Sequence, residues 1–480
     1  MQQNFSYEQE LGKANLEHRA AAELSNIINE LWYEKSIELI LFRNPLFEKT
    51  VSQILNLIQY SKEFVEKPMD IFQVLEVAKA IVEVRQNPAR IDIGKLTFES
   101  ITEGVNAEDL TTFIHSKVEG IDPKSDVEPK DVVLYGFGRI GRLLARELMM
   151  KLGKGQQLRL RAVVTRGEIN QQVLEKRASL LKTDSVHGDF NATVRVDAEQ
   201  KALIINGTPV LFISANQPED IDYTAYGIED ALVIDNTGAF RDKEALSRHL
   251  KSKGADRVLL TAPGKGVPNI VHGVNHKEHN PEEVEIFSAA SCTTNAITPI
   301  LKVVEDAYGV RKGHLETIHA YTNDQNLVDN MHKKYRRGRA AALNMVITET
   351  GAGKAVSKAL PALENKLTSS AIRVPVPNGS LAILNLQFNK ETSVSELNNL
   401  IKDAALNGEL VEQIKYEINN ELVSSDIVGT TAPSIFDSKA TIVDGDTAVL
   451  YVWYDNEYGY SHQVIRLAKY VAKVRRHTYY

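Results

Sequence analysis

A short apolar stretch, a glycine-rich turn and an amphipathic stretch follow one another between residues 131 and 152. The apolar stretch VVLY has the length of a buried strand, and RLLARELMMKL has helical spacing. Between them, GFGRIG places Gly136, Gly138 and Gly141 in the spacing GxGxxG. In this context the first glycine permits a tight turn, the second lets the backbone approach a pyrophosphate, and the third lets the helix pack on the strand. We therefore expect a dinucleotide-binding α/β domain.

Further strand-like stretches continue this pattern along the chain. LRLRAVVT ends at Thr165, where a residue that contacts the cofactor ribose is expected. Helix-like stretches alternate with several of the later strands, which favours a mostly parallel, doubly wound sheet. These later strand-like stretches are residues 202–205, 210–213, 231–234 and 258–260.

Cys292 is the single cysteine of the 480 residues, in the stretch FSAASCTTNAITP. Ser291 is a suitable N-cap and an apolar helical pattern follows, so the cysteine is expected at the start of a helix. There, unpaired N–H groups and the helix dipole would lower its pKa below the roughly 8.5 of a free thiol. On composition alone, a buried cysteine that acts as a small hydrophobic residue is the alternative. The hydroxyl-rich neighbours argue against it.

The composition limits the classes of protein to which the chain can belong. A chain of 480 residues is expected to form two to four domains. A net charge of −7 provides no general attraction to nucleic acid or membranes, and one cysteine excludes an intramolecular disulfide or a cysteine-cluster metal site. We therefore predict no metal site, no nucleic-acid partner and no membrane association. No signal-peptide pattern and no apolar stretch of about 18 residues is found, so a reducing, cytoplasmic location is expected.

Residues 1–125 differ from the rest of the chain. They contain four of the 28 glycines, and their apolar residues recur at the helical spacing i, i+3, i+4 and i+7. We therefore predict a small all-helical domain of three to five helices. The stretch GIDPKSDVEPK, residues 120–130, is polar, contains two prolines and is expected to be a linker. No group of residues here suggests a chemistry, so the function of this region and any partner that it binds stay open.

Beyond Cys292 the strand-like stretches become longer. They are LETIHAYT, SSAIRVPVP, SLAILNLQF and TAVLYVWYD, separated by helical patterns near residues 354–363 and 393–405. This arrangement is typical of an α+β domain with a mainly antiparallel sheet. We predict a dinucleotide-binding domain over residues 131–291, a catalytic domain over residues 292–456, and a C-terminal helix, about residues 457–480, that completes the dinucleotide-binding domain.

Six motifs, in this order, carry a resemblance to a known family: YGFGRIGR, SAASCTTNAITP, TIHAYTNDQ, TETGAGKAV, AIRVPVPN and WYDNEYGYSH. They make residues 131–478 closely similar to phosphorylating glyceraldehyde-3-phosphate dehydrogenase, which has a Rossmann-type domain. The resemblance implies an oxidoreductase of glycolysis and gluconeogenesis, usually a homotetramer. It implies conversion of D-glyceraldehyde 3-phosphate, inorganic phosphate and NAD or NADP to 1,3-bisphosphoglycerate. Residues 1–130 lie outside the resemblance.

The resemblance also implies roles for individual residues. Cys292 resembles the nucleophile that forms a hemithioacetal and then a thioester, and His319 resembles its base. Taken alone, a histidine inside a strand is more often a packing residue. Residues resembling the attacking-phosphate site are Ser291, Thr293, Arg337, Thr350 and Gly351, and those resembling the substrate-phosphate site are Thr322, Asp324 and Arg373. Residues resembling the cofactor site are Gly136, Phe137, Gly138, Arg139, Ile140, Gly141, Thr165, Arg166, Thr237, Gly238, Phe240, Thr261, Asn456 and Tyr460.

The chain departs from the family pattern at the expected ribose contact. Thr165 stands where an aspartate selects NAD, and Arg166 beside it could pair with a 2′-phosphate. Asn330 and Met331 also replace a Leu-Pro pair that disfavours this phosphate. We therefore expect NADP use, either preferred or alongside NAD. The alternative is that Thr165 and Arg166 are solvated and that Glu168 replaces the missing acid.

The chain departs from the family pattern at two further positions, and the basic stretch, the substrate and the function each have an alternative explanation. Ala296 replaces a second cysteine, and Tyr135 replaces the asparagine usual before the glycine motif. The basic stretch KKYRRGR around Arg337 is typical of a solvated face, and a nucleic-acid contact is the weaker explanation. Erythrose 4-phosphate is an alternative substrate. A regulatory or scaffolding protein that retains the fold is an alternative of another class.

Overall fold

The computed structural model describes residues 6–62, 65, 67–84, 88–119 and 128–479. Its contacts divide the chain into two compact units. The N-terminal unit comprises Met1–Glu128, Lys151–Gln157 and Arg475–Tyr480, and the larger unit comprises Pro129–Met150 and Leu158–Val474. The domain boundaries given above remain predictions. Of the predicted linker, residues 120–127 lie outside the described residues, and Lys130 already belongs to a strand.

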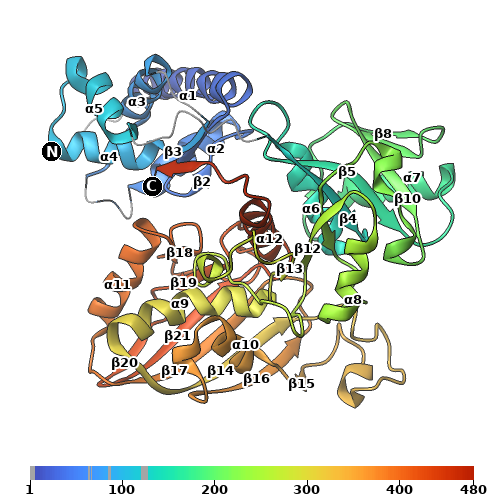
Figure 1. Cartoon of the computed structure of the whole chain (residues 1–480). Helices are drawn as coiled ribbons and strands as arrows, with labels where there is room; N and C mark the ends of the chain where they lie inside the picture. The colour runs from blue at the N-terminus through green and yellow to red at the C-terminus, as the bar shows by residue number, and fades with distance from the viewer. Residues whose placement is uncertain (1–5, 63–64, 66, 85–87, 120–127, 480) are drawn as a thin grey trace. The chain divides into compact units, whose positions relative to one another are not determined.

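Helices and a four-stranded sheet make up the described part of the N-terminal unit (Figure 1). The all-helical prediction for residues 1–125 is therefore wrong, although the helical spacing does correspond to helices. The sheet has the order β2-β1-β3-β22, in which β3 pairs in parallel with both β1 and β22. The elements are α1 (Tyr7–Lys35), β1 (Ile37–Leu41), β2 (Asn44–Pro45), α2 (Val51–Ser61), α3 (Ile71–Glu83), β3 (Ala89–Asp92), α4 (Ile93–Glu103), α5 (Leu110–Val118) and β22 (His477–Tyr479).

This sheet could not be predicted from the sequence for two physical reasons. All five residues of β1, IELIL, are buried, and such a short apolar run shows no period that separates strand from helix. The strand β22, which pairs with β3, lies almost 400 residues later in the sequence. No local sequence pattern can therefore predict this pairing. Residues 151–157 join the same unit through Trp32, whose indole N–H donates to Leu152 O at 2.7 Å.

An eight-stranded sheet in the larger unit carries the glycine motif. Its order is β13-β12-β11-β4-β5-β10-β9-β8, parallel from β13 to β10 and antiparallel at β9 and β8. This confirms the mostly parallel, doubly wound sheet. The elements are β4 (Lys130–Tyr135), α6 (Arg139–Met150), β5 (Leu158–Thr165), α7 (Gln171–Lys182), β6 (Thr183–Asp184), β7 (Gly188–Asp189), β8 (Val194–Asp197), β9 (Ala202–Ile205), β10 (Thr208–Ser214), β11 (Ala231–Asp235), α8 (Lys243–Ser247), β12 (Ala255–Leu260) and β13 (Ile286–Ser288).

A second large sheet follows, with the order β15-β16-β14-β17-β21-β19-β18, and β20 pairs with β21. Most of its neighbours are antiparallel, which confirms the prediction, while β14–β16 and β18–β19 are parallel. The elements are α9 (Cys292–Tyr308), β14 (Val310–Ala320), β15 (Val346–Thr348), α10 (Ala352–Ala359), β16 (Leu367–Val374), β17 (Ser380–Phe388), α11 (Val394–Leu406), β18 (Ile414–Glu417), β19 (Ser434–Asp437), β20 (Ile442–Asp444), β21 (Thr447–Tyr454) and α12 (Tyr458–Val471).

Helix α9 lies across one face of this second sheet (Figure 1). Its apolar residues, among them Ile297, Ile300 and Leu301, share a buried cluster with strand residues such as Leu384 and Leu450. Burial of this face holds the helix against the sheet. No helix in the described part of the chain is long and apolar enough to cross a membrane.

Candidate active site and cofactor site

The cysteine loop enters α9 with Cys292 as the first helical residue. The Ser291 side chain accepts a hydrogen bond from the Thr294 N–H at 3.1 Å, which confirms the predicted N-cap. The Asn295 amide donates to Ala289 O at 2.7 Å and to Ser291 O at 2.9 Å. These bonds tie the first turn of the helix to the preceding loop, so the thiol is held at a helix N-terminus.

Strand β14 brings His319 to this thiol. Nε2 of His319 lies 3.6 Å from Sγ of Cys292, and the imidazole is 7% exposed. β14 pairs with β16 in the register His319↔Arg373, so Arg373 is the neighbour of the histidine. Cys292 and His319, which were predicted to act together, are therefore in contact although they are 27 positions apart.

Nδ1 of His319 has two neighbours that demand different tautomers. Ala320 O lies 2.7 Å away and can only accept a proton, whereas Nη1 of Arg373 lies 2.6 Å away and can only donate one. With the proton on Nδ1, Nε2 is free to accept the thiol proton. With Nδ1 accepting from Arg373, Nε2 carries the proton toward Sγ. Arg373 also donates to Ala320 O at 2.8 Å, so it remains bonded in both tautomers.

The electrostatics of the pair differ from the sequence prediction. Burial, the largest influence, raises the pKa of Cys292, and the nearby Arg373 charge and the Thr293 N–H only partly oppose it. The predicted lowering of the thiol pKa is therefore wrong in this structure. Burial, followed by the charge of Arg373, lowers the pKa of His319 to about 3. At neutral pH the pair is consequently a thiol beside a neutral imidazole, because desolvation disfavours both charged forms.

Two arginines that were predicted to bind phosphate, Arg337 and Arg373, lie near the Cys292–His319 pair. Arg337 is buried, pairs with the Asp324 carboxylate and donates from Nε to Thr348 Oγ1 at 2.9 Å. Burial and then the positive charge of Arg337 lower the pKa of Arg373, with Cys292 and others opposing, so the two cations lie within electrostatic reach. Asp324 and Arg337, assigned by resemblance to different phosphate sites, are therefore directly paired.

The remaining predicted phosphate ligands lie on three segments of the chain. Thr293 shares a hydrogen bond with the Tyr454 hydroxyl at 3.0 Å, beside the thiol. Gly351 is the residue before α10, and the Thr350 side chain accepts from the Ala352 N–H at 3.2 Å. Thr322 follows β14 and is partly buried. Their roles as phosphate ligands remain predictions.

A cavity of about 420 Å³ lies where the glycine motif meets the ends of β4, β5 and β11. Six of the predicted cofactor residues line it, and so do five residues that were not predicted to bind the cofactor, Arg177 among them. The full lining is Tyr135, Gly136, Phe137, Gly138, Val164, Thr165, Arg166, Arg177, Ala215, Thr237 and Ala239. This is the strand-order reversal of an open α/β sheet, the usual ligand position in such folds.

The three glycines have the geometry that a dinucleotide requires. Gly136 has a φ of +103°, and an added Cβ at Gly141 would lie 2.5 Å from Gly136 O, so neither position accepts a side chain. An added Cβ at Gly138 would meet nothing within 4 Å, which leaves its backbone open to a ligand. Thr165 Oγ1 is buried without a hydrogen bond among the described residues. An open backbone and an unsatisfied hydroxyl fit a pyrophosphate and a ribose.

Several other predicted cofactor residues do not line this cavity, and some have structural partners instead. They are Arg139, Ile140, Gly141, Gly238, Phe240, Thr261, Asn456 and Tyr460. Phe240 packs edge-on against Tyr135 with the ring centroids 6.2 Å apart, and Thr261 donates to Asp235 O. The Tyr460 hydroxyl donates to Ala290 O at 2.9 Å and so holds the cysteine loop.

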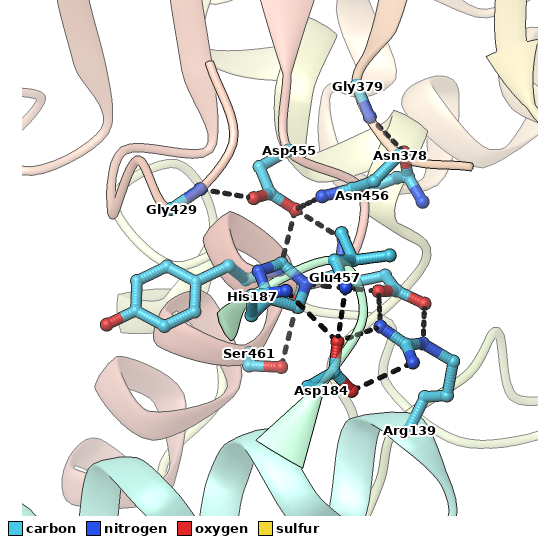
Figure 2. Close-up of polar contacts among 12 residues, drawn as sticks. Arg139, Asp184, His187, Asn378, Gly379, Gly429, Asp455, Asn456, Glu457 and Ser461 are labelled. Carbon is cyan, nitrogen blue, oxygen red and sulfur yellow. Dashed lines mark hydrogen bonds and ion pairs between the residues drawn. The ribbon is translucent and has the colours of Figure 1, made fainter. Parts of the chain in front are cut away.

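A polar network surrounds Asn456 (Figure 2). Its Oδ1 accepts from the Gly379 N–H at 3.2 Å and from the Ser380 hydroxyl at 2.9 Å, which turns Nδ2 away from these partners. Next to it, Glu457 accepts two hydrogen bonds from Arg139, and Arg139 also donates to Asp184. Sequence analysis missed Glu457 and Asp184, because no spacing rule links residues this far apart.

Comparisons with known proteins agree with this arrangement. The family described as "Glyceraldehyde 3-phosphate dehydrogenase, NAD binding domain" matches residues 130–243, and the family described as "Glyceraldehyde 3-phosphate dehydrogenase, C-terminal domain" matches residues 291–456. A "Glyceraldehyde-3-phosphate dehydrogenase-like protein" of Pseudomonas aeruginosa (strain UCBPP-PA14) is 46% identical over 454 residues, 93% of this chain and 98% of that protein. An alignment of this length includes most of the N-terminal unit.

Other relatives match about 71% of the chain. "Glyceraldehyde-3-phosphate dehydrogenase 2" of Trichormus variabilis (strain ATCC 29413 / PCC 7937) is 41% identical over 344 residues, 71% of this chain and 98% of that protein. "Glyceraldehyde-3-phosphate dehydrogenase" of Geobacillus stearothermophilus is 39% identical over 343 residues, again 71% and 98%. With both domains matched and this identity over most of its length, the chain belongs to the glyceraldehyde-3-phosphate dehydrogenase family.

Proposed function

We propose that the protein is a phosphorylating dehydrogenase that converts D-glyceraldehyde 3-phosphate, inorganic phosphate and NAD(P) to 1,3-bisphosphoglycerate. The observation that carries this proposal is the 3.6 Å approach of Cys292 Sγ and His319 Nε2 at the head of α9. It is supported by the dinucleotide cavity and by membership of the family. The reaction needs a nucleophile, a base, anion-binding groups and a cofactor site, and candidates for all four lie in the larger unit.

The pair acts by proton transfer within a neutral couple. As Sγ of Cys292 attacks the aldehyde carbon, Nε2 of His319 takes the thiol proton, with Nδ1–H held by Ala320 O. The imidazolium then gives this proton to the oxygen of the hemithioacetal, and the neutral imidazole takes it back as the carbonyl of the thioester forms. A nicotinamide, when bound, supplies the hydride acceptor. Asn456, whose Oδ1 accepts from Gly379 and Ser380, would hold the carboxamide of that group through Nδ2.

The arginines account for the two phosphates. Arg373, next to His319, is placed to attract the phosphate of the substrate, and its positive charge also favours the thiolate form of Cys292. Arg337 and the N-terminus of α10 are suited to the attacking phosphate, because guanidinium and backbone N–H groups both donate to phosphate oxygens. An incoming phosphate would compete with Asp324 for Arg337.

The lining of the cavity favours NADP, alone or alongside NAD. Among the described residues that line it there are two arginines and no carboxylate, so nothing there repels a 2′-phosphate. Glu168, the alternative acid, is exposed and does not line the cavity. Thr165 lines the cavity, and its hydroxyl has no hydrogen-bond partner among the described residues.

We infer a homotetramer, as the resemblance to the family implies, and exposed apolar side chains between residues 327 and 347 support contact with another copy. Large apolar side chains rarely gather on the surface of a monomer, so a second copy of the chain is the expected cover. The exposed side chains are Leu327, Val328, Met331, Tyr335, Leu343, Met345 and Ile347, at 60–91% exposure. We also infer a cytoplasmic location, because the reaction requires a reduced Cys292. A partner of the N-terminal unit stays a prediction.

A steady-state assay of the purified protein tests the function. It combines two aldehydes, glyceraldehyde 3-phosphate and erythrose 4-phosphate, with two cofactors, NAD and NADP, each with and without inorganic phosphate. Phosphate-dependent reduction of either cofactor with the three-carbon aldehyde is the expected result. A preference for erythrose 4-phosphate would reassign the substrate. Absence of turnover under every condition would favour a regulatory or scaffolding role.

A further inference from the structure

Arg177, on α7, is a cation in the dinucleotide cavity that neither the glycine motif nor the mechanism uses. It lines the cavity together with Arg166 and with Thr165, the expected ribose contact. Its guanidinium lies over the ring of Phe212, with the central carbon 6.0 Å from the ring centroid. Phe212 is itself buried and packs edge-on against Phe137 at 5.4 Å. The side chain is therefore held in place by aromatic packing rather than by an acid.

The hydrogen-bonding capacity of Arg177 is largely unused. Within the described part of the chain it forms no ion pair with a carboxylate, and its Nε is buried without a hydrogen-bond partner. Two other arginines of the same domain show the contrast: Arg139 binds two carboxylates, and Arg146 donates to three backbone carbonyls. Burial, and then the charge of Arg142, lowers the pKa of Arg177, so the cation is destabilised where it stands.

A half-buried cation without an acid, aimed into a cavity, is a site for an anionic ligand. We propose that Arg177 and Arg166 together bind the 2′-phosphate of NADP, with Arg177 seated on Phe212 as the specificity-determining residue. Thr165, whose buried hydroxyl has no other hydrogen bond, completes the site at the ribose. This inference rests on the proposed nicotinamide-dependent function, but it concerns binding alone and is tested separately from turnover.

The test measures binding of adenosine 2′-monophosphate, adenosine 5′-monophosphate, NADP and NAD to the full-length protein by isothermal titration calorimetry. Wild type should bind adenosine 2′-monophosphate more tightly than the 5′ isomer. Arg177→Met should weaken adenosine 2′-monophosphate and NADP by about 10- to 100-fold, the usual range for a charge-assisted contact. NAD and adenosine 5′-monophosphate should change by less than about threefold. Arg177→Lys keeps the charge without the guanidinium fork, so it should retain intermediate affinity for the 2′-phosphate.

Arg195→Met is the matched control, because Arg195 is an exposed arginine of β8 that does not line the cavity. It should leave all four affinities unchanged, and circular dichroism with thermal unfolding checks that every variant is folded. If Arg177→Met is unstable, the affinities of Arg177→Lys and Arg166→Met are compared with those of wild type instead. Equal weakening of NAD and NADP by Arg177→Met would overturn the proposal and assign Arg177 to the adenine.

The two proposals fail in different ways. NAD-linked turnover without preferential binding of adenosine 2′-monophosphate would refute the phosphate site and leave the proposed function intact. Arg177-dependent binding of adenosine 2′-monophosphate without any turnover would refute the function and leave the phosphate site intact.

Discussion

Arg139 donates from Nε and Nη2 to the two carboxylate oxygens of Glu457, at 2.5 and 2.6 Å, across 318 positions of sequence. Arg139 directly follows Gly138 of the glycine motif, and Glu457 directly follows Asn456. The ion pair therefore joins the segment proposed to hold the pyrophosphate of the cofactor to the segment proposed to hold its nicotinamide. Arg139, which was predicted to bind the cofactor, thus also links these two segments to each other.

Replacement of Arg139 by Met should destabilise the larger unit. It would leave Glu457 and Asp184, which are mostly buried, without their cation, and breaking such a pair costs about 2–5 kcal/mol. We expect a lower urea midpoint of unfolding and weaker NAD binding. Glu457→Gln is the companion variant, because it removes a charge but retains hydrogen bonds and should cost less. An unchanged midpoint in Arg139→Met would contradict this role.

The same pair predicts how stability depends on pH. Burial would raise the pKa of Asp184 and of Glu457, but hydrogen bonds from Arg139 and other neighbours lower both below their usual values. Groups with a lowered pKa in the folded state add stability above their unfolded pKa, about 4, and lose it as the pH falls through the folded values. The gap in unfolding free energy between wild type and Arg139→Met should therefore shrink when urea titrations move from pH 7 to pH 3.

The reactivity of Cys292 should increase from neutral into alkaline pH. Its pKa is raised by burial, and the pKa of His319, about 3, lies too low to produce an imidazolium between pH 5 and 7. The rate of alkylation by iodoacetamide reports the thiolate alone, because the chain has a single cysteine. Arg373→Met should move this profile to higher pH, since the charge of Arg373 lowers the thiol pKa. A plateau already reached near pH 6 would mean a thiolate–imidazolium pair.

Replacement of either catalytic candidate should stop or slow turnover while leaving cofactor binding intact. Cys292→Ser should abolish it, because a serine hydroxyl is far harder to ionise than a thiol. His319→Asn should slow hydride transfer by roughly 10²- to 10⁴-fold, the span usual for loss of a general base. Stopped-flow measurement of reduced-cofactor formation checks both. Near-normal rates in either variant would remove that residue from the mechanism.

Trp32 should be essential to the N-terminal unit. It is 2% exposed, stacks on Phe47 with centroids 4.7 Å apart, and donates to Leu152 O in the inserted segment. Trp32→Ala should cost about 3–5 kcal/mol, because it leaves a cavity and an unpaired carbonyl. Trp32→Phe retains the stacking and should cost less. Chemical denaturation followed by intrinsic fluorescence and by far-ultraviolet circular dichroism measures the difference.

The exposed apolar surface between residues 327 and 347 should control assembly. Tyr335→Glu places a charge where a second copy is expected, so it should lower the mass measured by light scattering below that of wild type. Ile442→Glu is the control, because Ile442 is 54% exposed but lies in β20, outside this surface. If both variants keep the wild-type mass, this surface is not the subunit interface.

Local rules determined much of the fold and part of the site from sequence alone. The strand, glycine turn and helix around Gly136 depend on contacts between near neighbours, and so does the Ser291 cap that places Cys292 at a helix N-terminus. Alternation of strand-like and helix-like stretches was enough to predict both large sheets. These features follow from steric limits and hydrogen-bond spacing that act within about ten residues.

Tertiary structure alone decided the features that depend on burial and on contacts between distant segments. The pKa of Cys292 is raised rather than lowered, because desolvation by the whole fold outweighs the helix N-terminus. Arg139 pairs with Glu457 across 318 positions, Arg177 lines the cavity from a helix with no motif, and β22 pairs with β3. A sequence specifies such contacts only through the folded chain, because their energies depend on which groups exclude water from one another.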